Sequence, residues 1–245
     1  QVVFNTRFGE LWEDRGDLED EDAYLRRREE YPADLPDGVV VLTCGVDTQD
    51  DRLEYEIVGH GHFGETWGIQ VGAIMGRPDR ADVWERLDAV LNRVYRFKEG
   101  HGLRISYTFV DEGGHFTQEV RLACRARFEN NVFAIKGSSG GASVPYTAPP
   151  RKVKIVIDGK YLGTAFQYML GVDAGKLRIY DNLKVMTPGA NYCHFPIDPE
   201  RGYTKDYFHG LLSERLVYKA GQKNPWKWEK IPGHERNERL DTRNY

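Results

Sequence analysis

Two aspartates stand at positions where a protein can hold a divalent cation. Asp47, in GVDTQ, and Asp111, in FVDEGG, each close an apolar run that predicts a buried strand. Ligands of α/β sheets gather at the carboxyl ends of strands. Mg²⁺ takes few protein carboxylates and keeps waters and substrate phosphates, so two aspartates at one sheet edge suit it. Either aspartate alone is more often a turn or capping residue, but together they favour a metal site.

A third acid can come from the end of the chain. Glu238 and Asp241, in NERLD, are three residues apart and share one face of a predicted helix. Both can approach the aspartate pair, although Mg²⁺ accepts only a few carboxylates. We expect one to ligate the metal and the other to bind through water or to hold a cation such as Arg243. The longer side chain of Glu238 favours it as the direct ligand.

Lys136 and His194 are further candidates with open alternatives. Lys136 follows the predicted strand VFAIK and precedes a Gly-rich stretch, which suits either a phosphate contact or an ordinary surface lysine. His194, in YCHFP, is either a structural histidine with satisfied hydrogen bonds or a group that contacts phosphate or the leaving oxygen. The residues alone leave both questions open.

Several other chemistries are disfavoured. The segment GHGHFG, 59–64, fits G-x-G-x-x-G, but a strand-like run follows it, so we interpret it as a hairpin turn. The sequence contains no G-x-x-x-x-G-K-[ST] for a P-loop and no G-x-S-x-G nucleophile motif. The cysteines Cys44, Cys124 and Cys193 lie far apart, which argues against a structural zinc site and favours a reducing compartment.

Composition and charge indicate a globular chain with segregated charges. The 245 residues are 40 % hydrophobic and 29 % charged, and no apolar run approaches the roughly 20 residues of a membrane span. The formal net charge is -4, but residues 1–38 hold 12 acidic against 5 basic residues, whereas 136–184 and 201–245 are net basic. Such clustered cations form either a phosphate-binding face or solvated surface. Because the chain does not begin with Met, we expect a piece of a longer polypeptide.

The predicted elements begin after a loosely packed arm. Residues 1–38 have charge blocks and little apolar periodicity, and the folded body starts at Val39 with an antiparallel meander. Its three strands are predicted at 39–47, 52–59 and 65–74. Helices follow at 81–98, 115–128, 160–170 and 207–216, strands at 103–111, 132–136 and 177–180, a mobile loop at 137–150, and renewed order at 153–158. Three strands, helix, strand, helix, strand is the order of an α/β ribonuclease H-like domain, a mixed sheet flanked by helices.

Five stretches, in order, resemble the large subunit of tailed-phage DNA-packaging terminases of the cohesive-end, lambdoid type. They are LTCGVDTQDDRLEYEIVGHG, FVDEGGHFTQEV, VFAIKG, YCHFP and NERLDTRNY, and the resemblance extends from Asn5 to Tyr245. Such proteins join an N-terminal ATPase motor to a C-terminal nuclease with a ribonuclease H-like fold. The resemblance implies that 39–245 is the nuclease domain and 1–38 the acidic linker from the motor, in agreement with the missing P-loop.

The resemblance also implies an activity and its partners. The activity is metal-dependent endonucleolytic cutting of concatemeric viral DNA during genome packaging, with two Mg²⁺ or Mn²⁺ ions. The matching site positions are Asp47 and Asp111 as metal ligands, Glu238 or Asp241 as the closing acid, and Lys136 and His194 at the edge of the cleft. The implied partners are double-stranded DNA, the ATPase domain of the same polypeptide, the terminase small subunit and the portal protein or procapsid. The implied location is the cytoplasm of the infected bacterium, with no membrane partner.

Two other functions stay open. One is a different ribonuclease H-like nucleotidyl transferase, such as a transposase or a junction resolvase, which would share the acids. The other is a non-catalytic docking module of the packaging motor for portal or capsid, in which the carboxylates are structural. Cleavage of plasmid by the purified protein with Mn²⁺ distinguishes the docking module from both enzymes.

Overall fold

The computed structural model describes residues 20–138, 146–221 and 225–245, and its centre is an eight-stranded mixed sheet. From one edge of the sheet to the other, the strands are β10 (Cys193–His194), β3 (Thr66–Met75), β2 (Arg52–His60), β1 (Val41–Thr48), β6 (Ile105–Asp111), β7 (Val132–Ser138), β9 (Lys160–Gly171) and β8 (Tyr146–Ile157). β1 pairs antiparallel with β2, which pairs antiparallel with β3, while β6 and β7 continue from β1 in parallel. The five strands β3-β2-β1-β6-β7 have the ribonuclease H-like order, which confirms the predicted fold class.

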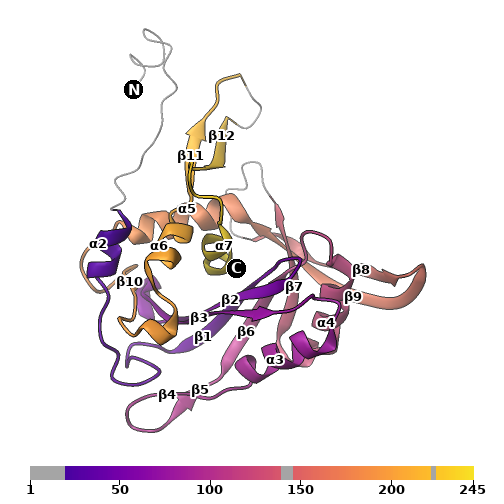
Figure 1. Cartoon of the computed structure of the whole chain (residues 1–245), viewed down its shortest axis with the longest axis horizontal. Helices are drawn as coiled ribbons and strands as arrows, with labels where there is room; N and C mark the ends of the chain where they lie inside the picture. Colours follow the sequence, from indigo (N-terminus) through magenta and orange to yellow (C-terminus); the bar gives the residue numbers. More distant parts are fainter. Residues whose placement is uncertain (1–19, 139–145, 222–224) are drawn as a thin grey trace.

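Helices cover both faces of this sheet (Figure 1). One face packs against α3 (Ala81–Leu91) and α4 (Thr117–Ala126), and the other against α5 (Val172–Leu183), α6 (Lys205–Leu211) and α7 (Glu238–Asn244), with α2 (Glu21–Arg26) beside α6. The short elements are β4 (Tyr95–Arg96), β5 (Gly102–Leu103), β11 (Glu214–Tyr218), β12 (Trp226–Lys230) and the 3₁₀ turns η1 (His62–Gly64), η2 (Phe128–Asn130) and η3 (Pro199–Arg201). None of the described helices is long and apolar enough to cross a membrane.

The side-chain alternation of β1 decides which face each residue serves. Leu42, Cys44 and Val46 are fully buried in one cluster with Trp84 and Leu87 of α3. Burial of a side chain of this size contributes about 1.5–3 kcal/mol. Because successive residues of a strand point to opposite faces, the odd-numbered residues of β1 point towards α7. The last of them is Asp47.

Glycine allows α7 to lie directly on the sheet. A Cβ atom at Gly45 would overlap the carbonyl oxygen of Thr242 in α7. Because Gly45 has no side chain, the backbone of the helix can approach β1 closely. Any other residue at position 45 would hold the helix farther from the strand. This close approach brings the first turn of α7 near the carboxyl end of β1.

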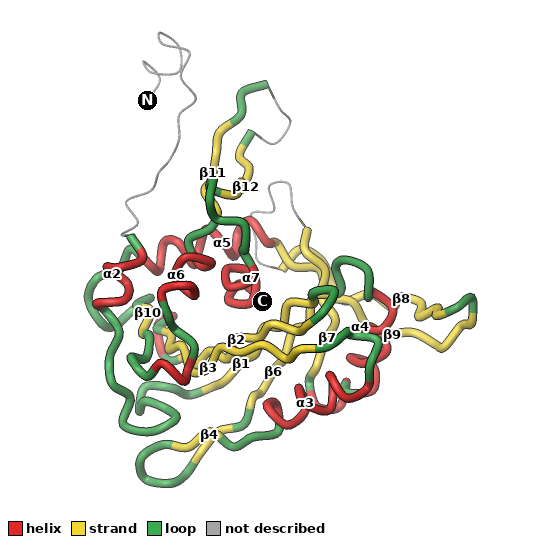
Figure 2. The backbone as a smooth tube through the Cα atoms, in the orientation of Figure 1, coloured by secondary structure: helices red, strands yellow, loops and turns green. Residues whose placement is uncertain are grey.

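Several predicted elements differ from the structure. The helix predicted at 160–170 is wrong, because these residues form β9, which pairs with β7 and, through a hairpin, with β8. Asp158 and Gly159 both have positive φ at the hairpin turn, as the Asp-Gly signal for a two-residue hairpin requires. The hairpin extends beyond the rest of the sheet (Figure 2).

Three further boundaries need correction. The strand predicted at 177–180 lies inside α5, and the helix predicted at 207–216 ends at Leu211 before β11 begins. The helix predicted at 81–98 ends at Leu91. The loop predicted at 137–150 lies partly outside the described residues, and its last five residues begin β8. The predicted turn at 59–64 is confirmed, since it joins β2 to β3.

The described part of the predicted arm, residues 20–38, is packed rather than loose. Tyr24 and Leu35 are fully buried. The guanidinium of Arg27 donates hydrogen bonds to the carbonyl oxygens of Leu183 and Val185, both at 3.0 Å. A few buried apolar side chains and the hydrogen bonds of Arg27 therefore hold this segment against the rest of the fold. A domain boundary at residue 38 stays a prediction.

Candidate functional site

The structure brings Asp47 and Asp111 to one edge of the sheet. β1 and β6 are neighbours in parallel, and Val46 lies opposite Val110, so the two aspartates follow the same rung of the ladder. Asp47 is only 6 % exposed and accepts a hydrogen bond from the side-chain amide of Gln49. Parallel pairing of two strands that each end in aspartate thus produces the cluster that the sequence predicted.

Asp241 of α7 is the third acid beside this pair. Its carboxylate accepts a hydrogen bond from Asn237 Nδ2 at 2.8 Å and lies 3.1 Å from the ammonium of Lys176. Lys176 is buried and also pairs with Glu214, at 2.8 Å. These contacts hold the Asp241 carboxylate in place from the side of α5 and β11.

The three carboxyl groups share a desolvated, negatively charged environment. Burial raises the pKa of Asp47 to about 7, with a further rise from the charges of Asp241 and Asp111. Burial raises the pKa of Asp111 to about 6. The hydrogen bond from the Gly113 backbone opposes this rise, and the charge of Asp241 adds to it. Burial also raises the pKa of Asp241, although the positive charge of Lys176 opposes it. A bound cation would relieve this repulsion.

Glu238 belongs to a different network. Its carboxylate pairs with Arg52 at 3.0 Å and with Arg236 at 3.4 Å, and both arginines also pair with the buried Glu54. The expected pairing of one α7 acid with Arg243 is wrong, because that guanidinium pairs with Glu56 at 2.6 Å instead. The structure places Glu238 beside cations, although its charge also adds to the raised pKa of Asp47, whereas the charge of Asp241 acts on both aspartates.

Lys136 lies next to the cluster on β7. Asp111 pairs with Ile135, so Lys136 is one residue further along the neighbouring strand. Its side chain is exposed, and its positive charge opposes in part the rise in the pKa of Asp111 that burial causes. Exposed cations continue on β8 at Arg151, Lys152 and Lys154, whereas the buried Lys176 does not belong to this surface.

His194 is not brought to the carboxylates, which corrects its expected place at the edge of the cleft. His194 lies on β10, where it pairs with Trp67 at the start of β3. β10 is the third strand from β1, and the register places His194 level with Leu42 instead of Asp47. Its ring nitrogens lie 2.5 Å from Glu29 and 2.8 Å from Glu65, and the ring stacks on Trp67. The structure thus favours the structural histidine of the two alternatives.

Sequence reasoning missed two residues of the site. Lys176 carried no signal, because a lone lysine just before a segment interpreted as a strand gives no reason to expect a buried ion pair. The pKa of Tyr245 is raised well above its usual value by burial and by the charges of Asp241, Asp111 and Asp47. Its side chain begins over Gly45 of β1, where an added Cβ would lie 3.1 Å from Tyr245 Cβ.

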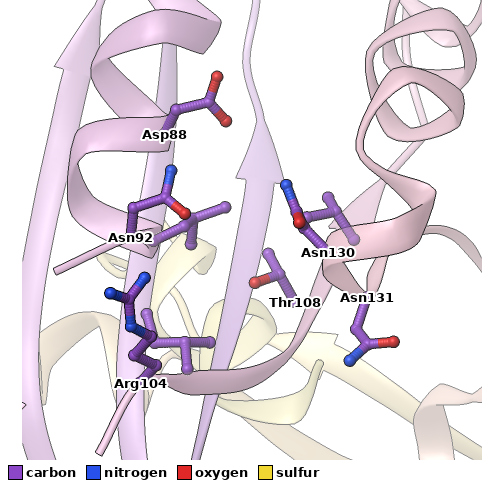
Figure 3. A pocket seen from close by; sticks show the side chains of 9 residues that line it. Asp88, Asn92, Arg104, Thr108, Asn130 and Asn131 are labelled. Carbon is purple, nitrogen blue, oxygen red and sulfur yellow. The ribbon is translucent and has the colours of Figure 1, made fainter. Parts of the chain in front are cut away.

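A polar pocket elsewhere in the molecule is separate from this cluster. It has a volume of about 200 Å³ and lies between α3, η2 and the beginning of β6. The residues labelled in Figure 3 are Asp88, Asn92, Arg104, Thr108, Asn130 and Asn131. Asp88 is already paired with Arg127, at 2.6 Å. The pocket opens at the end of β6 opposite Asp111, so it takes no part in the carboxylate site.

A mixed sheet in this strand order, with aspartates closing its two central parallel strands and an acid-bearing helix across them, defines a ribonuclease H-like protein. Its particular family follows from comparison with known proteins. All 245 residues match the family model described as the endonuclease domain of the terminase large subunit gpA, and the chain belongs to this family.

Two curated relatives are phage terminases. The chain is 34 % identical over 207 residues to the terminase large subunit of Escherichia phage lambda, covering 82 % of this chain and 31 % of that protein. It is 31 % identical over 236 residues to the terminase large subunit of Enterobacteria phage P21, covering 94 % of this chain and 34 % of that protein. The chain thus spans about a third of the length of these relatives.

Two solved structures are more distant. One is the large terminase of a thermophilic bacteriophage, with TM-score 0.47 and 13 % identity, covering 93 % of this chain and 42 % of that one. The other is a mutant nuclease domain of the large terminase subunit gp2 of bacterial virus Sf6 with manganese. Its TM-score is 0.48 at 11 % identity, covering 84 % of this chain and 88 % of that one.

Proposed function

We propose that this chain is a metal-dependent endodeoxyribonuclease that cuts concatemeric viral DNA during genome packaging. One observation carries the proposal: carboxylates from β1, β6 and α7, all at least partly buried, converge; burial raises the pKa of each, and the charge of Asp241 raises those of Asp47 and Asp111 further. Membership in a terminase endonuclease family supports the same activity. Phosphodiester hydrolysis by such a cluster depends on bound divalent cations.

The donor set fits a divalent cation. Asp47, Asp111 and Asp241 offer only oxygen atoms, which suit Mg²⁺ or Mn²⁺. These three residues would hold the metal, and we propose a site for two ions. When bound, the ions supply Lewis acidity and an activated water for the attack on phosphorus.

The other residues orient the ligands and attract the substrate. Lys176 and Asn237 fix the carboxylate of Asp241 through contacts at 3.1 and 2.8 Å, so that it faces the aspartate pair instead of solvent. Gln49 holds Asp47 in the same way. The exposed Lys136 is placed to contact a DNA phosphate beside the cluster, since a flexible ammonium binds phosphate as a point charge.

The whole terminase supplies the remaining parts of the reaction. We propose that the ATPase domain of the same polypeptide moves the DNA, and that the small subunit chooses the cutting site. The portal protein or procapsid receives the DNA, and the reaction takes place in the cytoplasm of the infected bacterium. The described part of this chain would then contribute the cut itself.

Plasmid cleavage with Mn²⁺ tests this function. We expect the purified chain to nick and linearise supercoiled plasmid, and Asp47→Asn and Asp111→Asn each to slow cleavage by about a hundredfold or more. Asp50→Asn is the matched control, because Asp50 is an exposed carboxylate three residues from Asp47. Full activity in either site variant would contradict the assignment.

The same assay separates the alternatives. A parent protein that leaves plasmid intact with both Mn²⁺ and Mg²⁺ would favour the docking module. Joined strands among the products would favour a nucleotidyl transferase of another kind.

A further inference from the structure

A second cluster of metal-ligating side chains joins three segments far from the carboxylate site in sequence. Glu21 begins α2, His209 lies in α6, and His234 lies in the loop between β12 and α7. One donor atom of each residue lies within 4.8 Å of the other two. Two imidazoles and one carboxylate therefore converge where α2, α6 and the approach to α7 meet.

Hydrogen bonds to backbone carbonyls fix which ring nitrogens are free. His234 Nδ1 lies 2.9 Å from the carbonyl oxygen of His209, and His209 Nε2 lies 3.3 Å from that of Gly233. A carbonyl oxygen only accepts, so each of these nitrogens carries a hydrogen. In the neutral rings, His234 Nε2 and His209 Nδ1 keep their lone pairs. Metal-ligating histidines characteristically donate their other N–H in this way.

The contact between His209 and Glu21 calls for a positive charge. His209 Nδ1 lies 2.6 Å from a carboxylate oxygen of Glu21, and in the neutral tautomer both atoms are acceptors. The rings of His209 and His234 stack at 3.7 Å between centroids and 14° between planes, so the two imidazoles lie side by side and would turn toward each other to share one ion. A second proton on His209 would satisfy this one contact, whereas a metal ion, with the donor atoms moved slightly apart, would take a lone pair from each ring and an oxygen from Glu21.

We propose that Glu21, His209 and His234 bind a zinc ion, with water as the fourth ligand, in a site without cysteine ligands that the spacing of the cysteines does not exclude. Two imidazoles and a carboxylate suit Zn²⁺, whereas the all-oxygen cluster of the candidate active site suits Mg²⁺ or Mn²⁺. The side chains of His209 and Glu21 are 42 % and 22 % exposed, so an ion can reach the site from solvent. This inference is independent of the proposed nuclease activity.

The position of the site gives zinc a structural effect. Between α2 and α6, the other charged contact here is the exposed ion pair of Lys205 with Asp22 at 2.9 Å, and exposed pairs contribute little. Zinc would cross-link α2 and α6 to the segment that leads into α7, which carries Asp241. Because the ion binds the folded state, it would raise the free energy of unfolding.

Isothermal titration of the purified chain with ZnCl₂ tests the proposal. We expect a zinc site whose affinity falls by about tenfold or more in His234→Ala and in Glu21→Gln. His62→Ala is the matched control, because His62 is exposed on the turn between β2 and β3. Asp47→Asn should leave this site unchanged, since it alters only the carboxylate cluster. Both altered side chains are partly exposed, and circular dichroism checks that each variant is folded.

Cobalt provides a spectroscopic second measurement. Co²⁺ in place of zinc should give the intense visible absorption of a tetrahedral site, and His234→Ala should remove it. Zinc affinity unchanged in both His234→Ala and Glu21→Gln would overturn the proposal. So would a site lost in Asp47→Asn, because the ion would then belong to the carboxylates.

Discussion

The two acids of α7 divide between two charge networks. Asp241 is held by Lys176 and Asn237 and its charge acts on both Asp47 and Asp111. Glu238 faces Arg52 and Arg236. Neutralising charges are therefore already present around Glu238, whereas the cluster around Asp241 has a surplus of negative charge that favours cation binding.

This division predicts different effects of two matched substitutions. Asp241→Asn should slow plasmid cleavage by about a hundredfold, because it removes a carboxylate beside the metal position. Glu238→Gln should change the rate by only about threefold, since its carboxylate pairs with Arg52 of β2 and with Arg236, just before α7. Initial rates at saturating Mn²⁺ measure both. A large loss in Glu238→Gln with an active Asp241→Asn would restore Glu238 as the ligand.

His194 predicts a pH-dependent contribution to stability. Burial alone would lower its pKa, but the hydrogen bonds and charges of Glu29 and Glu65 outweigh burial and raise it. A raised histidine pKa stabilises the fold below the unfolded value of about 6.5, and this contribution is lost as the pH rises through the folded value. His194→Gln should therefore cost about 1–3 kcal/mol at pH 6 and less at pH 9. Urea unfolding at both pH values measures the difference, and an equal loss would contradict the charged state.

At the scale of elements, α7 is short and depends on its contacts with the sheet. Seven residues form a marginal helix by themselves. Arg239 pairs with Glu54 at 2.7 Å and Arg243 with Glu56 at 2.6 Å, and both glutamates are almost completely buried on β2. Loss of one partner of such a pair leaves a buried charge and costs about 3–5 kcal/mol. The ion pairs and the close approach at Gly45 together place Asp241.

The close approach predicts the effect of a single methyl group. Gly45→Ala should displace α7, lower the free energy of unfolding by about 1–3 kcal/mol and reduce plasmid cleavage, because the added Cβ overlaps a backbone carbonyl. Gly137→Ala on β7 is the milder comparison, since its Cβ would meet a side-chain methyl of Val172 at 2.8 Å, whereas the Cβ at Gly45 would meet a backbone oxygen at 2.0 Å. Denaturant unfolding and cleavage rates measure both effects. Wild-type activity in Gly45→Ala would show that the helix position tolerates the shift.

At the scale of the whole molecule, the acidic and basic parts of the chain lie in different places. In the described part of the arm, Glu21 and Asp22 contact His209 and Lys205 of α6. The exposed Lys136 lies on β7, the strand next to Asp111, and the exposed cations of β8 follow at the edge of the sheet on the same side of β6. A chain of net charge -4 can therefore present a basic surface beside its carboxylate cluster.

This distribution predicts how the isolated chain cuts DNA. Cleavage should show little sequence preference, should not respond to ATP, and should fall steeply between low and moderate salt, because phosphate contacts dominate binding. Plasmid assays over a salt series with and without ATP measure this. Lys152→Ala should weaken the salt dependence, since its exposed ammonium lies on β8. Site-specific or ATP-dependent cutting by this chain alone would contradict the proposed division of labour.

Local patterns were sufficient for the central part of the fold. Alternating apolar residues such as Leu53 and Ile57 predicted the meander, and the apolar runs that end in Asp47 and Asp111 predicted two strands and their closing acids. These signals are local, because burial on one face of a strand repeats every second residue. The edge of the sheet was mispredicted at β9, because residues 160–170 were interpreted as a helix. The Asp158-Gly159 pair before them is a hairpin signal that indicated a strand instead.

Tertiary structure alone decided which distant side chains meet. The sequence placed Glu238 and Asp241 on one helix face and favoured the longer Glu238 as ligand, but their surroundings depend on how Arg52 and Lys176 reach α7 from other elements. It gave no reason to combine His209 with His234, which join only because α6 packs beside the loop before α7. Spacing along a chain fixes neighbours within one element, whereas contacts between elements follow from the packing of complete faces.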